Sequence, residues 1–269
     1  MDQGKKLPRI EILPIGREIL TGRIQEKHAG WIAARVASQG GMVHRITVVD
    51  DDEAAIAAEL IAAANRETKI LIVTGGMGPT FDDITLKALA KGASIPLELT
   101  DQARDFVAKK YRELFERKLV PHPDMSPERE KMAWLPKGAT MLHNETGAAP
   151  GARFEYRNVT VFVLPGPPKE FEPMYMSAVD PEIREALKGR ALCEMTFPTD
   201  IADESVLTPI CERINAEHDD TLVKSNATFF GDTKGLSVTV TVWGENTDQC
   251  REKVERLGRE LENELKNTP

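Results

Sequence analysis

Two adjacent carboxylates stand where a glycine-rich loop meets the start of a predicted helix. The loop carries three glycines and then two aspartates: Gly75, Gly76, Gly78, Asp82 and Asp83. Glycine lets the backbone approach a bulky ligand, and free backbone N–H groups at a helix start favour a phosphate or another anion. The two carboxylates would repel a bare phosphate, but they suit a divalent cation. The stretch therefore predicts a phosphate site in which a divalent cation lies beside Asp82 and Asp83.

A plainer interpretation of the same stretch is also open. The run Ile70–Val73 is short and β-branched, as in a strand that is buried on both faces, and a helical segment follows over residues 84–93. In this interpretation Thr80 or Asp82 is the N-cap of that helix, and the glycines only form a turn. Such strand–loop–helix units are common in α/β proteins, so this loop alone does not decide between the two interpretations.

Further small-residue loops favour the binding site. A predicted strand over residues 9–15 leads into Gly16–Gly22, and another over residues 159–164 leads into Pro165–Glu170. In an open α/β sheet the carboxyl ends of the strands share one edge, where ligands bind. Three glycine-containing loops at that edge are hard to explain by turn chemistry alone. Asn144–Gly151 is a fourth loop of small residues, ahead of an antiparallel pair over residues 153–156 and 159–164.

The elements that position these loops alternate between strand and helix. Strands are predicted over residues 9–15, 43–49 and 70–73, and helices over residues 27–39, 53–65, 84–93 and 100–116. This order predicts an α/β fold with a doubly wound, mostly parallel sheet. The acids at 50–52 are expected to cap a helix, the proline-rich segment 117–128 to form a loop or lid, and residues 169–178 to form a helix. We place this nucleotide- or pterin-binding domain at residues 1–180.

The pattern changes near Arg190. Strands are predicted over 192–197, 222–230 and 236–243, and helices over 204–215 and 248–265. This β-α-β-β-α order predicts a small α+β second domain at residues 190–269. Its charged residues fit a solvated helix face, and no catalytic constellation stands out in it.

Composition narrows the class of protein. The 269 residues carry a formal net charge of −8, with 41% hydrophobic and 29% charged residues. The negative charge argues against nucleic acid and anionic membranes as partners, and no apolar run is long enough to span a membrane. Cys193, Cys211 and Cys250 lie far apart and are expected to be free thiols in a reducing compartment. We therefore expect a cytoplasmic protein with a small-molecule ligand.

Four loops taken together resemble a known family. TGGMGPTFDD (Thr74–Asp83), NETGAAPG (Asn144–Gly151) and LPGPPKE (Leu164–Glu170) resemble signatures of the CinA amino-terminal module, and GREILTG (Gly16–Gly22) resembles its first loop. That module shares the molybdopterin-binding fold of MogA and MoaB. The resemblance covers about residues 9–180, and the tail is similar to the family's small KH-like domain. It implies a cytoplasmic homo-oligomer, a dimer or trimer, that binds a pterin or a nucleotide pyrophosphate.

The resemblance also implies an activity. CinA-type modules are associated with an ADP-ribose pyrophosphatase activity that needs a divalent metal. The nicotinamide mononucleotide deamidase domain of full-length CinA proteins has no counterpart in this sequence, so we expect no deamidation. Two positions depart from the family pattern. Arg17 stands where Asp is usual, which removes a possible metal ligand and adds a bidentate phosphate donor. His28 stands in place of an Asn and is expected to be exposed at a helix start.

The leading hypothesis is metal-dependent hydrolysis of ADP-ribose to AMP and ribose 5-phosphate. Asp82 and Asp83 are the predicted catalytic ligands of Mg²⁺, Mn²⁺ or Co²⁺, and Glu18 is the candidate general base or second metal ligand. The amides of Gly75, Gly76 and Gly78 are expected to hold the pyrophosphate. The predicted substrate-binding residues are Gly16, Arg17, Gly75, Gly76, Gly78, Thr80, Lys131, Gly147, Pro150, Gly166 and Pro167.

Two alternatives to this hypothesis stay open. The first is molybdopterin binding in molybdenum cofactor biosynthesis, with adenylyl transfer as in MogA-like proteins. The second is a non-catalytic ligand-sensing or scaffold module. Arg17 and His28 favour this second alternative, whereas the intact Asp82-Asp83 pair argues against it.

Overall fold

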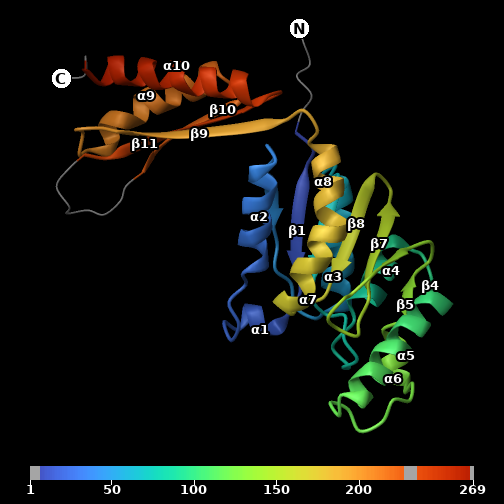
Figure 1. Ribbon diagram of the computed structural model, residues 1–269. Helices are drawn as coiled ribbons and strands as arrows, with labels where there is room; N and C mark the ends of the chain where they lie inside the picture. The colour runs from blue at the N-terminus through green and yellow to red at the C-terminus, as the bar shows by residue number, and fades with distance from the viewer. Residues whose placement is uncertain (1–6, 227–234, 267–269) are drawn as a thin grey trace. The chain divides into compact units, whose positions relative to one another are not determined.

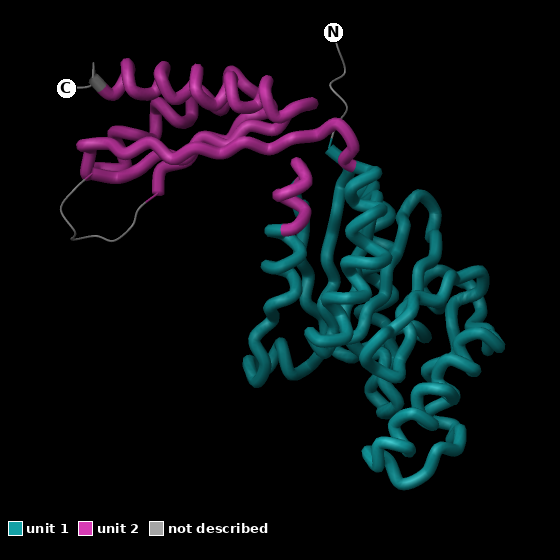
Figure 2. Tube along the Cα trace, viewed as in Figure 1, with its two compact units in different colours: residues 1–34, 42–186 teal, residues 35–41, 187–269 magenta. Residues whose placement is uncertain are grey.

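The computed structural model describes residues 7–226 and 235–266, and it divides into two compact units. The first unit comprises residues 1–34 and 42–186, and the second comprises residues 35–41 and 187–269 (Figure 2). Each unit has its own hydrophobic core, so each is described by itself.

A six-stranded sheet organises the first unit (Figure 1). Its order is β2 (Val43–Ile46), β1 (Ile10–Pro14), β3 (Ile70–Thr74), β8 (Val159–Leu164), β7 (Gly151–Tyr156) and β6 (Thr140–Leu142). The first four strands run parallel, and β7 is antiparallel to both β8 and β6. This is the mostly parallel α/β sheet that the alternating sequence pattern predicts.

Helices cover both faces of this sheet, and its central strands are accordingly buried along their whole length. Every residue of β1, β3 and β8 is buried. Alternate side chains such as Leu71 and Val73 share a core with Leu60 and Leu89 of the helices α3 and α4. The helices of the unit are α1 (Arg17–Leu20), α2 (His28–Ser38), α3 (Glu53–Asn65), α4 (Thr85–Ala93), α5 (Asp101–Glu116), α6 (Pro127–Lys131), α7 (Pro168–Met174) and α8 (Asp180–Ala186). A two-stranded ribbon adds β4 (Leu97–Leu99) and β5 (Trp134–Pro136).

The helix starts agree with the sequence at two places and differ at a third. Asp52 caps α3 by accepting from the Ala55 N–H, and Thr100 caps α5 by accepting from the Ala103 N–H. The proposal that Thr80 or Asp82 caps the helix after the glycine loop is wrong. That helix begins at Thr85, and its N-cap residue makes no side-chain capping bond. The acids of the loop are therefore left for other contacts.

The helix that follows β8 is longer than the predicted segment 169–178. After α7 the chain continues through a π-helical turn, η1 (Tyr175–Val179), directly into α8. Phe171 and Tyr175 of this helix are fully buried and contact Trp31 of α2 edge to face. These aromatic contacts hold α2 and the π-helical segment together. The predicted loop 117–128 also ends early, because α6 begins at Pro127.

The second unit contains a three-stranded antiparallel sheet in the order β10, β11, β9. Its elements are β9 (Ala191–Pro198), α9 (Glu204–Glu217), β10 (Thr221–Asn226), β11 (Ser237–Gly244) and α10 (Thr247–Lys266). Both helices lie on one face of the sheet (Figure 1), where Leu207, Ile214 and Leu257 pack against Val223 and Val240. This is the predicted β-α-β-β-α arrangement, although residues 227–230 of the predicted second strand lie outside the described residues.

Candidate ligand-binding site

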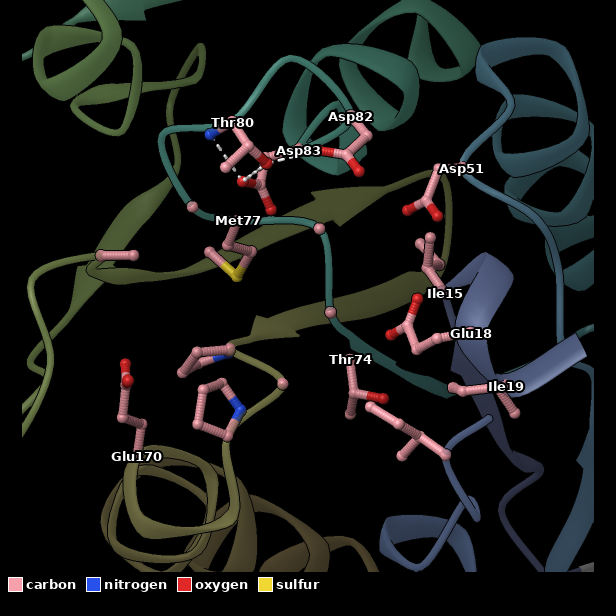
Figure 3. Close-up of a pocket in the computed structure, with 18 of the residues that line it drawn as sticks. Ile15, Glu18, Ile19, Asp51, Thr74, Met77, Thr80, Asp82, Asp83 and Glu170 are labelled. Carbon is pink, nitrogen blue, oxygen red and sulfur yellow. Dashed lines mark hydrogen bonds between the residues drawn. The ribbon is translucent and has the colours of Figure 1, made fainter. Parts of the chain in front are cut away.

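A pocket of about 960 Å³ opens at the carboxyl ends of β1, β3 and β8. The loops after these three strands line it, as the sequence predicts for an open α/β sheet. Figure 3 shows the glycine loop crossing the pocket, with Glu18 and Asp51 on one side and Glu170 on the other. The predicted site residues that line this pocket are Glu18, Gly75, Gly76, Gly78, Thr80, Asp82, Asp83, Gly166 and Pro167.

Two glycines shape the loop after β3. Gly75 and Gly76 have φ angles of +98° and +64°. A Cβ on Gly75 would lie 2.4 Å from the Ile15 carbonyl oxygen, and one on Gly76 would lie 2.2 Å from Thr85 Oγ1. Thr85 fixes the turn, because its hydroxyl donates to the Gly75 carbonyl at 2.9 Å and its N–H donates to the Gly76 carbonyl at 3.2 Å. Both space and φ therefore require glycine here.

Three consecutive N–H groups of this loop, those of Gly76, Met77 and Gly78, have no acceptor among the described residues. All three residues line the pocket. Gly75 differs, since its N–H donates to the Leu164 carbonyl at 3.0 Å. The prediction that the Gly75 amide holds a ligand is therefore wrong, because that amide joins the glycine loop to the end of β8. Unpaired successive amides in a pocket form a concavity that suits an anion.

Asp82 and Asp83 are both held by Thr80. The Thr80 hydroxyl contacts Asp82 Oδ1 and lies 2.7 Å from Asp83 Oδ2, which also accepts from the Thr80 N–H at 2.8 Å. The hydrogen bond from Thr80 is the main reason that the pKa of Asp82 lies below its usual range. Thr80 therefore orients the two aspartates at the pocket wall.

Lys131 reaches the same loop from outside the pocket. Its ammonium donates to the Thr80 carbonyl, and burial lowers its pKa while Asp83 and Asp82 oppose that shift. Lys131 lines a second cavity of about 670 Å³ that shares the glycine loop, rather than the pocket itself. Its contact is with the loop backbone, so the prediction that Lys131 contacts the ligand is not supported by its position.

Asp51 is a site residue that sequence reasoning missed. It lies beside Glu18 at the pocket wall, and its Oδ2 accepts from the Arg17 N–H at 2.9 Å. Burial is the largest cause that raises the pKa of Asp51, and the nearby carboxylates of Glu18 and Asp82 raise it further. We expected this acid to cap the helix together with its neighbours, but Asp52 alone of the three caps it.

Arg17 does not line the pocket, and its role as a ligand residue stays a prediction. Its guanidinium forms a bidentate pair with Asp50, with Nε 2.9 Å from Oδ1 and Nη2 3.0 Å from Oδ2. The side chain is 70% exposed and does not line the pocket. A bidentate pair with a carboxylate uses the same donors that a phosphate would need.

Three other predicted residues also lie outside the pocket lining, namely Gly16, Gly147 and Pro150. The N–H of Gly16 donates to the Val49 carbonyl, and Pro150 is buried. The N–H of Gly147 donates to the carboxamide oxygen of the fully buried Asn144 at 2.8 Å. Their role in the structure is to shape the loops, and the neighbours Ala148 and Ala149 reach the pocket instead.

Asn144 connects two of the four loops. Its Nδ2 donates to the Ala149 carbonyl at 2.8 Å and to Glu170 Oε2 at 2.7 Å. Glu170 belongs to the first turn of α7 and lines the pocket. The side chain of Asn144 thus fixes the Asn144–Gly151 loop against the carboxylate of Glu170, a site residue that the sequence did not single out.

His28 also lines the pocket, and its environment differs from the expected exposed position. It is the first residue of α2, as predicted, but it is half-buried and its ring stacks on Phe171 with the centroids 4.1 Å apart. Burial lowers the pKa of His28, and the carboxylates of Glu26 and Glu172 oppose the shift. The neutral imidazole is therefore the favoured form at neutral pH.

Metal binding at Asp82 and Asp83 stays a prediction. Within the described residues, no three His, Cys, Asp or Glu side chains are grouped as ligands of a metal ion. Thr80 occupies one oxygen of each aspartate. As placed, the donor set does not fit a formed metal centre.

The parallel sheet and the pocket at its carboxyl edge define an α/β domain of the kind that binds small molecules at its glycine-rich loops. Residues 11–185 match the family described as "Probable molybdopterin binding domain", and the chain belongs to this family. No helix among the described residues is long and apolar enough to cross a membrane.

Similar proteins cover nearly the whole chain. A protein from Pyrococcus abyssi is 34% identical over 249 residues, which is 92% of this chain and 94% of that protein. One from Thermococcus kodakarensis is 35% identical over 256 residues, which is 94% of this chain and 98% of that protein. The crystal structure of the protein CinA, of unknown function, from Thermoplasma acidophilum has a TM-score of 0.58 and 31% identity, and covers 65% of this chain and 98% of its own. The resemblance to CinA carried by the four loops is confirmed.

Proposed function

We propose that the first unit binds a phosphorylated pterin of the molybdopterin type at the pocket. The observation that carries this proposal is the run of three pocket-lining N–H groups, Gly76 to Gly78, without an acceptor among the described residues. Successive amides suit a phosphate group, and the family to which the chain belongs is described by molybdopterin binding. In this proposal the phosphate binds to these amides, and the pterin ring occupies the rest of the pocket.

The charges around the pocket support the same ligand. Arg23 and Lys27 line the pocket from the exposed loop between α1 and α2 and add positive charge for a phosphate. The carboxylates of Glu18, Asp51 and Glu170 are hydrogen-bond acceptors. A pterin ring offers amino and ring N–H donors to such acceptors. In this proposal the ligand is neutralised partly by the protein's own cations.

Titration of the purified protein with molybdopterin by isothermal calorimetry tests the proposal. A ligand at a hundred times its Kd should stabilise the protein by about 2.7 kcal/mol, so a thermal shift provides a second readout. A matched pterin without the phosphate should bind at least about tenfold more weakly, because a hydrogen bond to a charged group contributes roughly 1.5–3 kcal/mol. Equal affinities for the two compounds would contradict the role of the amides, and no binding of either would refute the proposal.

A second candidate function is hydrolysis of a nucleotide diphosphate sugar such as ADP-ribose. It is favoured by one observation, the four carboxylates of Glu18, Asp51, Asp82 and Asp83 on the pocket wall (Figure 3). Replacing both Asp82 and Asp83 by Asn should abolish any AMP release, while the melting temperature stays within a few degrees. A double variant that still hydrolyses ADP-ribose at the wild-type rate would exclude these aspartates from the reaction. The assay is run with and without Mg²⁺, Mn²⁺ and Co²⁺.

The oligomeric state is also a proposal. The dimer or trimer implied by the resemblance is tested by light scattering of the purified chain at two concentrations. A mass that equals one chain at both would exclude a stable homo-oligomer.

A further inference from the structure

Two of the three cysteines lie close together in the second unit, although they are 57 positions apart in the sequence. Cys193 lies near the start of β9 and Cys250 in the first turns of α10. The Cys193 Sγ lies 3.6 Å from the Thr247 carbonyl oxygen on α10, and the Cys250 Sγ lies 3.5 Å from the Ala191 carbonyl oxygen on β9. Each thiol thus donates to the backbone of the element that carries the other, and, after burial, Cys193 is among the groups that raise the pKa of Cys250.

The surroundings keep the two thiols in place. Cys250 is 1% exposed and belongs to the core of the unit, and Cys193 packs against that core while staying partly exposed. Gly244 leaves room for the Cys250 side chain, since a Cβ there would lie 2.7 Å from the Cys250 Sγ. The β-sheet register fixes Cys193 opposite Val242 on β11. One thiol is therefore accessible and its neighbour is buried directly beside it.

We propose that Cys193 and Cys250 form a modification site, a dithiol that a low-molecular-weight disulfide converts into an intramolecular disulfide. The thiolate of Cys193 attacks one sulfur of the external disulfide, forms a mixed disulfide and releases one thiol. Cys250 then loses its proton and attacks the Cys193 sulfur, which expels the second thiol. Two protein thiols are oxidised and one external disulfide is reduced to two thiols, so atoms and electrons balance.

The accessible thiol reacts first because attack requires contact with the reagent, and the buried thiol resolves the mixed disulfide. Burial raises the pKa of Cys250, which disfavours its direct reaction with solvent reagents. Proximity favours the second step, since each thiol lies against the backbone of the element that carries the other thiol. Cys211 lies in α9 and is buried, so it provides an internal control within the same unit.

The test uses the full chain with oxidised glutathione as the reagent. After incubation and removal of the reagent, the free thiols of the denatured protein should fall from three per chain to one. Mass spectrometry should show the loss of two hydrogen atoms and a peptide that joins Cys193 to Cys250. The Cys211→Ser variant should keep no free thiol after the same treatment, because its remaining pair closes.

Two further variants distinguish the proposed Cys193–Cys250 disulfide from adventitious oxidation. Cys250→Ala should stop at a stable glutathione adduct on Cys193, and Cys193→Ser should keep both of its thiols. Circular dichroism checks that each variant is folded. If only one of the two variants folds, that variant is sufficient for the test. Three remaining thiols in the wild type, a persistent glutathione adduct on Cys193, or a bridge that includes Cys211 would each overturn the proposal.

Discussion

The imidazole of His28 lies flat against the phenyl ring of Phe171, with an angle of 7° between the two planes. The contact joins the start of α2 to α7, and thereby two walls of the same pocket. Because Phe171 is fully buried, the stacked face of His28 is shielded from water. His28 is thus an integral part of the pocket wall.

His28 should make stability depend on pH. Burial lowers its pKa in the folded protein, so the unfolded chain binds a proton at a pH where the folded protein does not. The contribution of the neutral ring is therefore complete above the unfolded pKa of about 6.5 and is lost as the pH falls below it. Urea unfolding at about pH 7.5 and pH 5 should show a steeper loss of stability in the wild type than in His28→Asn. Parallel losses in the two proteins would contradict this prediction.

Arg17→Gln should leave ligand affinity unchanged within about twofold, because the guanidinium is paired with Asp50 and does not line the pocket. Calorimetric titration of the variant with molybdopterin measures this. Asp50→Asn is the matched control, since it frees the guanidinium without altering Arg17. A loss of affinity in Arg17→Gln of tenfold or more would restore Arg17 as a ligand residue.

Gly76→Ala should destabilise the protein more than Gly22→Ala. Both glycines have a positive φ, and a Cβ in that conformation costs roughly 1–2 kcal/mol. A Cβ on Gly76 would also lie 2.2 Å from Thr85 Oγ1, whereas a Cβ on Gly22 would have no atom within 4 Å. Overpacking of this kind adds about 1–3 kcal/mol. Urea unfolding of the two variants gives the comparison, and equal losses would show that the loop yields to the extra methyl group.

Thr80→Val should raise the pKa of Asp82 toward its usual value, because the hydroxyl of Thr80 is the main group that lowers it. Thr80→Ser keeps the hydroxyl and should keep the lowered pKa. Carbon-detected NMR titration of the Asp82 carboxylate measures both variants. An unchanged pKa in Thr80→Val would mean that other groups, such as Lys131, hold the carboxylate in its ionised form.

Periodicity and turn chemistry were sufficient to predict the sheet and most helices. The helix at Glu53–Asn65 has the predicted bounds, since an Ala- and Leu-rich run begins after an aspartate that can cap it. The two antiparallel strands before α7 were predicted as a pair that turns at residues 157–158. The position of the site could be predicted, because the loops after parallel strands share one edge of the sheet.

The chemistry within that site depended on partners distant in sequence. Whether the Gly75 amide is free depends on the Leu164 carbonyl, and whether Arg17 is free depends on Asp50, 33 residues away. Neither pairing has a local signal in the sequence. His28 was misjudged for the same reason, because its burial comes from Phe171 in another helix.

The π-helical turn sets the rotational phase of two helices. Phe171, Tyr175, Val179 and Ile183 are all fully buried although they repeat every four residues. In an unbroken α-helix each such step would rotate the buried side by about 40°, so the last of them would lie roughly 120° from the first. The wider turn at Tyr175–Val179 takes up part of that rotation. Deleting one residue there would turn α8 by about 100° relative to α7, so this segment should tolerate substitution better than any change of length.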